Sequence, residues 1–239
     1  MSFKDSVVTI FGLNGVQANE LIYFEGGASG VALNLEYNLI KALVFGGPNS
    51  VRTSETVKRS KVVMRVGVGH NILGRIANPL GIAIDGLGDI KFDLFNPIEK
   101  KAPGVITRKK INQSIETGLK VVDALVPIGR GQRELILGDR KTGKTTIAID
   151  AILNQIESQK KFRDTVSCIY VAVGKRMAEI VRITRLLKQR GAMAYTAVIV
   201  ARASDPASLQ FIAPYSACTM AEYFTYRGEH ALIIYDDLS

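Results

Sequence analysis

The stretch that decides the fold is Gly138-Asp139-Arg140-Lys141-Thr142-Gly143-Lys144-Thr145. It matches G-x-x-x-x-G-K-[ST], a pattern in which a glycine-rich turn brings backbone N–H groups onto a phosphate. Gly138 lets the chain turn tightly, and Gly143 removes a Cβ that would keep the phosphate away. Lys144 is expected to bring its charge to the β and γ phosphates, and the Thr145 hydroxyl to complete a Mg²⁺ shell. We therefore take all eight residues as candidate nucleotide-binding residues, and the strand predicted before them and the helix predicted after them support this interpretation.

The segments around this motif alternate between strand and helix. Residues 133–137 predict a short apolar strand before the loop. Residues 144–158 predict a helix after it, with Ile147, Ile152 and Ile156 on the buried face. Such alternation is typical of a mostly parallel sheet with right-handed crossovers. The alternation continues with predicted strands over residues 166–173, 195–200 and 230–237 and a predicted helix over residues 175–190. A further helix is predicted to reach about Phe224. Asp205 is its expected N-cap and Pro206 its first helical residue.

The last predicted strand ends in two carboxylates, because its apolar run is followed by Asp236 and Asp237. A carboxylate at the end of a buried strand holds Mg²⁺ through water, opposite the phosphate loop. The run-then-carboxylate pattern favours Asp236, although strand alternation cannot choose between the two. Asp236 lies 92 residues after Lys144, with two predicted strands between them, as in the RecA-like class. The alternative interpretation is a solvated strand end.

Hydrolysis would require a group that takes a proton from water. The predicted strand at 166–173 continues into Gly174, Lys175 and Arg176 without a carboxylate. Glu179 and Glu134 are not convincingly placed. The sequence therefore predicts Mg-nucleotide binding with no catalytic residue.

The first 60 residues have a period of two instead. Short strands are predicted at 7–11, 20–24, 30–35 and 41–45, with glycine-rich turns between them. Evenly spaced short strands predict a small β-barrel. Proline-containing segments between residues 96 and 104 predict an extended connector.

Composition limits the function classes. The 239 residues carry a net charge of +9, and residues 1–94, 95–160 and 161–239 contribute +1, +5 and +3. A solvated basic surface is the default interpretation, with an anionic ligand or nucleic acid as the alternative.

Cys168 and Cys218 have no CxxC partner and are expected to be buried free thiols. No apolar run approaches the roughly 18 residues of a membrane span, so no direct membrane insertion is expected.

Longer strings of sequence carry a family resemblance. Together with the loop, four segments closely resemble alpha subunits of rotary F-type ATP synthases: residues 102–108, 117–135, 202–215 and 230–239. The resemblance implies an N-terminal β-barrel, a RecA-like domain and a helical domain. It implies a ring of alternating alpha and beta subunits, with central and peripheral stalk subunits as further partners. Alpha subunits in this family bind Mg-ATP or ADP without turning it over, which implies that this chain supports ATP synthesis at a neighbouring beta subunit.

Two positions depart from the family pattern. Lys141 stands where alpha subunits usually have Gln, and Gly174-Lys-Arg-Met stands where they have Gly-Gln-Lys-Arg-Ser. The chain also stops after the Asp236 strand, so we expect a fragment without the helical domain. The expected organisation is an α/β fold, with a partial β-barrel over residues 1–60 and a truncated RecA-like P-loop domain over residues 61–239.

Resemblance also suggests a compartment. Several strings favour a mitochondrial protein on the matrix side of the inner membrane, peripherally bound, and others favour the stromal side of the plastid thylakoid membrane.

Two rival functions remain open. A ring-shaped RNA-dependent ATPase or translocase also joins a barrel to a RecA-like domain, but it should interleave aromatic and basic residues on the barrel. The near-neutral first 94 residues argue against that, and no nucleic-acid partner is expected. A nucleotide-binding scaffold outside energy coupling is the other rival, and co-purification with a beta-type chain would discriminate it.

Overall fold

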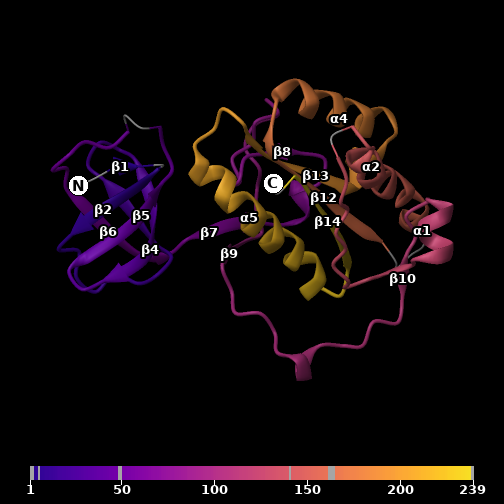
Figure 1. Ribbon diagram of the computed structural model, residues 1–239, viewed down its shortest axis with the longest axis horizontal. Helices are drawn as coiled ribbons and strands as arrows, with labels where there is room; N and C mark the ends of the chain where they lie inside the picture. Colours follow the sequence, from indigo (N-terminus) through magenta and orange to yellow (C-terminus); the bar gives the residue numbers. More distant parts are fainter. Residues whose placement is uncertain (1–2, 5, 48–49, 140, 161–164, 238–239) are drawn as a thin grey trace.

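Two large β-sheets organise the chain in the computed structural model, which describes residues 3–4, 6–47, 50–139, 141–160 and 165–237. Figure 1 shows the N-terminal sheet at one end and a layered α/β unit at the other. The two sheets correspond to the two rhythms of the sequence, period two before residue 60 and strand–helix alternation after residue 110.

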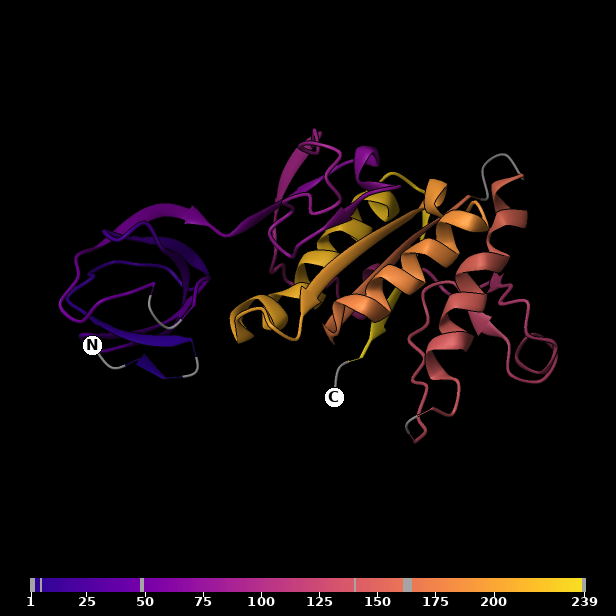
Figure 2. The same cartoon turned by 90° about the horizontal axis from the view of Figure 1, so that it is seen from above.

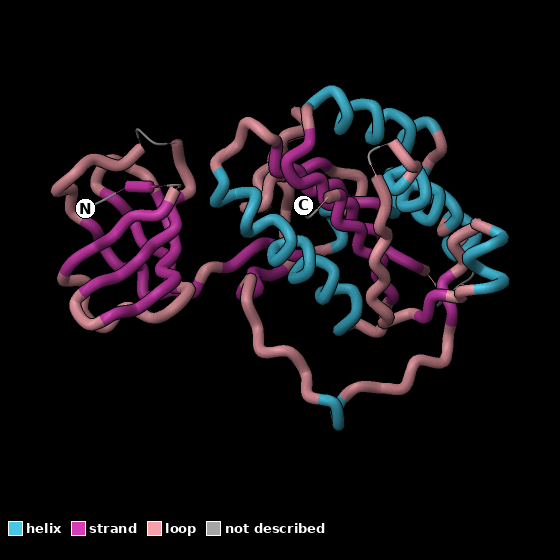
Figure 3. The backbone as a smooth tube through the Cα atoms, in the orientation of Figure 1, coloured by secondary structure: helices cyan, strands magenta, loops and turns pink. Residues whose placement is uncertain are grey.

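The N-terminal sheet is antiparallel and has the strand order β1-β2-β5-β4-β3-β6. All four strands predicted here are present, and β1 and β6 were not predicted. The sheet curls around an apolar core that includes Val8, Ile22 and Ala42 (Figure 3). In the described pairings β1 and β6 remain the two edges, so what the structure establishes is an antiparallel sheet. The strands are β1 (Phe3–Lys4), β2 (Val7–Phe11), β3 (Glu20–Phe24), β4 (Ser29–Glu36), β5 (Leu39–Val44) and β6 (Val57–Val63).

A second, smaller set of elements connects the two sheets. β7 (Arg65–Val68) pairs antiparallel with β9 (Leu94–Pro97), and a long loop then runs away from the body of the molecule (Figures 1 and 3). Val105 and Ile106 on this loop are almost fully exposed. The remaining elements of this region are η1 (His70–Ile72), β8 (Ile76–Ala77), η2 (Val105–Thr107), β10 (Ser114–Ile115), α1 (Lys120–Leu125) and β11 (Ile128–Gly129). Of these, β8 belongs to the second large sheet.

The second large sheet is parallel, with the order β14-β12-β13-β8. Helix α5 covers one face, and α2 and α4 cover the other (Figure 2). The predicted mostly parallel α/β sheet is therefore confirmed. Its elements are α2 (Lys144–Asn154), α3 (Ile156–Gln159), β12 (Val166–Lys175), α4 (Met177–Gln189), η3 (Ala192–Tyr195), β13 (Thr196–Arg202), α5 (Ala207–Tyr226) and β14 (His230–Asp236).

Strand β12 shows why the sequence here lacks alternation. Ile169 and Val171 pack on the α5 side, whereas Cys168, Tyr170 and Ala172 pack on the side of α2 and α4. Because helices cover both faces, every position from 166 to 172 is buried. Cys168 and Cys218 are both free thiols, the first fully buried and the second only partly.

The predicted strand before the phosphate loop is wrong. Residues 132–139 pair with no strand in the described structure, and the Leu135 and Leu137 side chains are 74% and 81% exposed. A strand forms only where a neighbouring strand supplies hydrogen-bond partners, and β14, the sheet edge, does not pair with this segment. Apolar composition alone could not provide that partner.

Two further local expectations need correction. Helix α5 begins at Ala207 with Pro206 at the N-cap, one residue later than expected, and the Asp205 carboxylate accepts a hydrogen bond from the Arg202 N–H at 2.8 Å rather than from the helix. On α2 and α3, Ile147 and Ile156 are exposed, and Ile149 takes the buried position beside Ile152.

The N-terminal sheet and the α/β unit share an apolar contact. Leu43 on β5 and Met64 after β6 form one buried cluster with Ile212 on α5. No helix in the described part of the chain is long and apolar enough to cross a membrane.

Candidate nucleotide-binding site

The phosphate loop has the backbone that its sequence requires, in the part that is described. Arg140 lies outside the described residues. Lys141 and Gly143 both have left-handed backbone angles, with φ of 67° and 97°. A Cβ on Gly138 would lie 2.8 Å from the Thr142 hydroxyl, which itself donates to the Asp139 carbonyl at 2.8 Å. Turns that mix right- and left-handed residues aim their N–H groups into an anion-binding concavity.

Lys144 folds back over this loop. Its ammonium donates to the Gly138 carbonyl and, at 2.8 Å, to the Asp139 carbonyl. Residues 138, 139 and 141–142 are exposed, so the loop is open to an anion from solution. Carbonyl oxygens hold the ammonium in place, and the phosphate oxygens of a ligand would compete for the same charge.

The Asp236 carboxylate lies next to the start of α2. Its Oδ2 accepts hydrogen bonds from the Thr145 hydroxyl at 2.8 Å and from the Tyr170 hydroxyl at 2.6 Å. Thr145 comes from the first turn of α2, Tyr170 from β12 and Asp236 from the last residue of β14. The fold thus brings together the two predicted metal ligands, Thr145 and Asp236, at the carboxyl end of the parallel sheet. Asp237 is exposed.

Lys175 supplies the third contact on this carboxylate. Its Nζ lies 2.9 Å from Asp236 Oδ1, and the Lys175 and Asp236 side chains are 19% and 10% exposed. The site therefore contains a nearly buried ion pair beside the phosphate loop.

Burial controls the ionisation of Tyr170. It raises the pKa of the Tyr170 hydroxyl far above its usual range, and the negative Asp236 oxygen raises it further. Tyr170 therefore stays protonated and acts as a hydrogen-bond donor to Asp236.

The expectation that no residue acts as a water-activating base stays a prediction, and the described carboxylates lie as follows. Asp236 is bonded to three donors. Glu179 and Glu134 are both exposed, and Glu134 accepts a hydrogen bond from the Gln132 amide at 2.9 Å. β12, beside β14, ends in Lys175, which cannot accept a proton while it is charged.

A magnesium ion would find hard oxygen donors in Thr145 and Asp236, which suit its chemistry. No group of three or more His, Cys, Asp or Glu side chains gathers in the described residues. The donor types therefore fit Mg²⁺ held mainly by a nucleotide's phosphates, but Lys175 already neutralises the carboxylate.

The sequence missed Tyr170 and the role of Lys175 as a partner of Asp236. Tyr170 lies within an apolar run that predicts only a buried strand. In the sequence, Lys175 stands out only as part of a strand end that lacks a carboxylate. A polar hydroxyl inside a strand buried on both faces was the available signal, since such a group needs a partner.

Comparison with known proteins matches residues 118–239 to the ATP synthase alpha/beta family, nucleotide-binding domain. The chain is 50% identical to proteins named ATP synthase subunit alpha from Rickettsia bellii, over 98% of this chain, and from Helicobacter pylori, over 100% of it. The protein of the same name from Aquifex aeolicus is also 50% identical over 98% of this chain. In each case the match covers 46% of the relative, so this chain spans a little under half their length.

Proposed function

Because the chain belongs to the ATP synthase alpha/beta family, we propose that it is a nucleotide-binding, non-catalytic alpha subunit of a rotary, proton-transporting ATP synthase. In this role it binds ATP or ADP at the Gly138–Thr145 loop and supports ATP synthesis at a neighbouring beta subunit. The relatives described above, named ATP synthase subunit alpha, support the assignment to the alpha rather than the beta type.

The observation that carries the binding proposal is the contact between the loop helix and the acidic strand. The Thr145 hydroxyl lies 2.8 Å from Asp236 Oδ2, although 91 residues separate them in sequence. This contact joins the phosphate loop to the carboxylate that would orient water around Mg²⁺. When Mg²⁺ is bound, it offsets the charge of the phosphates. Lys144 and the loop N–H groups bind the phosphates directly.

The proposed lack of catalysis follows from the strand beside Asp236. β12 ends in Lys175, whose ammonium is bound to the carboxylate at 2.9 Å. Water placed in line with a γ-phosphate would meet a cation there rather than a base. The chain therefore holds nucleotide without splitting it.

The partners and location are part of the same proposal. We place the chain in a ring of alternating alpha and beta subunits, with central and peripheral stalk subunits, on the matrix side of the mitochondrial inner membrane. We also propose that the N-terminal region, expected over residues 1–60 and with its last strand β6 ending at Val63, acts as a β-barrel that joins the ring. The RecA-like nucleotide domain, expected over residues 61–239, then follows β6.

Two substitutions in the loop test nucleotide binding. Lys144→Ala removes a charge-assisted phosphate contact of about 1.5–3 kcal/mol, so ATP binding should weaken by about 10- to 150-fold. Lys141→Gln is the matched control, because it removes one exposed charge from a variable position of the same loop, and it should change affinity less than about threefold. Equal losses, measured by calorimetric titration with ATP, would contradict the assignment of the loop.

A reconstituted ring tests the lack of catalysis. Replacing only the phosphate-loop lysine of the beta-type subunits should remove ATP hydrolysis, with labelled nucleotide still retained on this chain. Hydrolysis that survives this change and disappears with Lys144→Ala would mean that this chain is catalytic.

A further inference from the structure

The ion pair between Lys175 and Asp236 lies beside Thr145, so it involves one of the two residues expected to face Mg²⁺. Asp236 Oδ1 contacts the Lys175 ammonium at 2.9 Å, and Oδ2 accepts from Thr145 and Tyr170 at 2.8 and 2.6 Å. Both Asp236 oxygens are thus bonded to protein donors. One of those donors carries a full positive charge.

A local irregularity of β12 aims Lys175 at this carboxylate. The register with β13 pairs Val173 with Ala201 and Lys175 with Arg202, so Gly174 is an extra residue, and its φ is +66°. In an undisturbed strand Lys175 would share the α5 face with Ile169 and Val171. The bulge turns it instead to the face of Tyr170 and Asp236. Bulges of this kind re-aim a side chain.

The surroundings favour keeping the pair intact. The Asp236 residue is only 8% exposed and the Lys175 side chain 19% exposed. A metal ion that used this carboxylate would displace the ammonium and leave it without its partner in a poorly hydrated position, which is costly. With the pair intact, the carboxylate offers little net negative charge to Mg²⁺.

We infer that Lys175 serves as a built-in cation at Asp236, so that this chain binds the nucleoside di- or triphosphate with little dependence on Mg²⁺. The inference rests on the proposed function, since it concerns the same loop. Lys175 is a positioning residue here: it holds the carboxylate and supplies positive charge beside Thr145, while Lys144 and the loop N–H groups contact the phosphates.

The test is calorimetric titration of the purified chain with ATP, in excess MgCl₂ and in EDTA. For the wild-type chain we expect the two Kd values to differ by less than about threefold. In Lys175→Gln, which removes the charge, we expect Mg²⁺ to tighten binding by about tenfold or more, in proportion to one charge-assisted contact. Lys175→Arg keeps the charge and should behave as wild type. Lys188→Gln is the control, because it removes an exposed lysine from the end of α4.

The outcomes separate the two proposals. A wild-type Kd that falls tenfold or more on addition of Mg²⁺ overturns the inference, as does an unchanged Mg²⁺ dependence in folded Lys175→Gln. If circular dichroism shows that Lys175→Gln does not fold, the wild-type ratio of Kd values still decides. If neither condition gives binding that Lys144→Ala weakens, the proposed function itself fails.

Discussion

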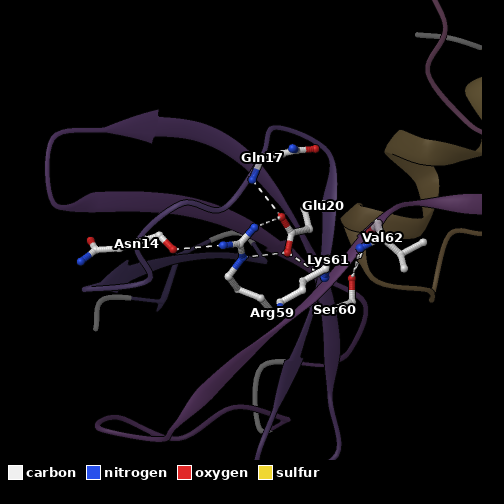
Figure 4. Close-up of polar contacts among 7 residues, drawn as sticks. All are labelled: Asn14, Gln17, Glu20, Arg59, Ser60, Lys61 and Val62. Carbon is white, nitrogen blue, oxygen red and sulfur yellow. Dashed lines mark hydrogen bonds and ion pairs between the residues drawn. The ribbon is translucent and has the colours of Figure 1, made fainter.

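Glu20 offers a sharp test of how the N-terminal sheet is stabilised. Its carboxylate lies at the start of β3 and receives the Arg59 guanidinium of β6 through Nε at 3.0 Å and Nη2 at 2.9 Å (Figure 4). The N–H groups of Gln17 and Lys61 each donate to it at 2.9 Å. The Glu20 side chain is only 2% exposed, so Glu20→Gln places an amide NH₂ among these donors and removes the charge.

The magnitude follows from the ionisation of Glu20. Arg59 and the two backbone donors lower the pKa of Glu20 from 4.5 to about 2, although burial acts in the opposite direction. At about 1.4 kcal/mol per pKa unit this shift sets an upper bound of about 3 kcal/mol. Because the Arg59 side chain is 26% exposed, solvent screening reduces the expected loss in the free energy of unfolding to about 2 kcal/mol at pH 7.

The pH dependence gives a second measurement. A carboxyl whose pKa is lower in the folded state stabilises the fold above its unfolded pKa, near 4.5, and loses that contribution as the pH falls toward about 2. Glu20→Gln lacks this titration. The difference in unfolding free energy between wild type and variant should therefore be constant above pH 5 or so and shrink between pH 4.5 and 2.

Urea unfolding followed by circular dichroism measures both effects, and the chain contains its own control. Glu36 pairs with Lys41 at 3.0 Å in the same sheet, with both side chains about half exposed. Glu36→Gln should cost less than about 0.5 kcal/mol. Equal losses for Glu20→Gln and Glu36→Gln, or a difference that does not change down to pH 2, would refute the argument.

Two further predictions concern the α/β unit. Tyr170→Phe removes the 2.6 Å hydrogen bond to buried Asp236, and should lower the unfolding free energy by about 1–3 kcal/mol in urea titrations; a neutral result would mean that water replaces the hydroxyl. Ile152→Ala deletes a fully buried side chain of α2, and should cost about 2–5 kcal/mol. Ile147→Ala, at a position 37% exposed on the same helix, should cost less than about 1 kcal/mol, and a similar loss for the two alanine variants would contradict the observed buried face.

Periodicity by itself located most of the elements. The strands over 166–173, 195–200 and 230–237 were placed within two residues of β12, β13 and β14 at each end. Their apolar runs are long because helices cover both faces of the sheet. Most of the buried positions therefore hold apolar residues that can be identified in the sequence. The loop Gly138–Thr145 is also a local pattern, because its backbone requirements select particular residues at fixed spacing.

The pairing of a strand with a distant segment could not be predicted from the sequence of either segment. Residues 133–137 have the composition of a strand but remain unpaired in the described structure, because a strand depends on a neighbour that the segment's own sequence does not specify. The unpredicted β6 is the opposite case, since it alternates poorly yet pairs with β3 and carries Arg59 to Glu20. Both outcomes depend on contacts between residues far apart in the chain.

The features of the site also divide into local sequence patterns and contacts that only the tertiary structure makes. The sequence by itself contains the G-x-x-x-x-G-K-[ST] loop and the strand-ending carboxylate, because each is a local pattern. Only the tertiary structure decided that Asp236 is bound by Thr145, Tyr170 and Lys175, from three different elements. The bulge at Gly174 is the physical reason for the last contact, since it turns Lys175 to the face where β14 ends beside α2, and no single-segment pattern specifies which strand lies there.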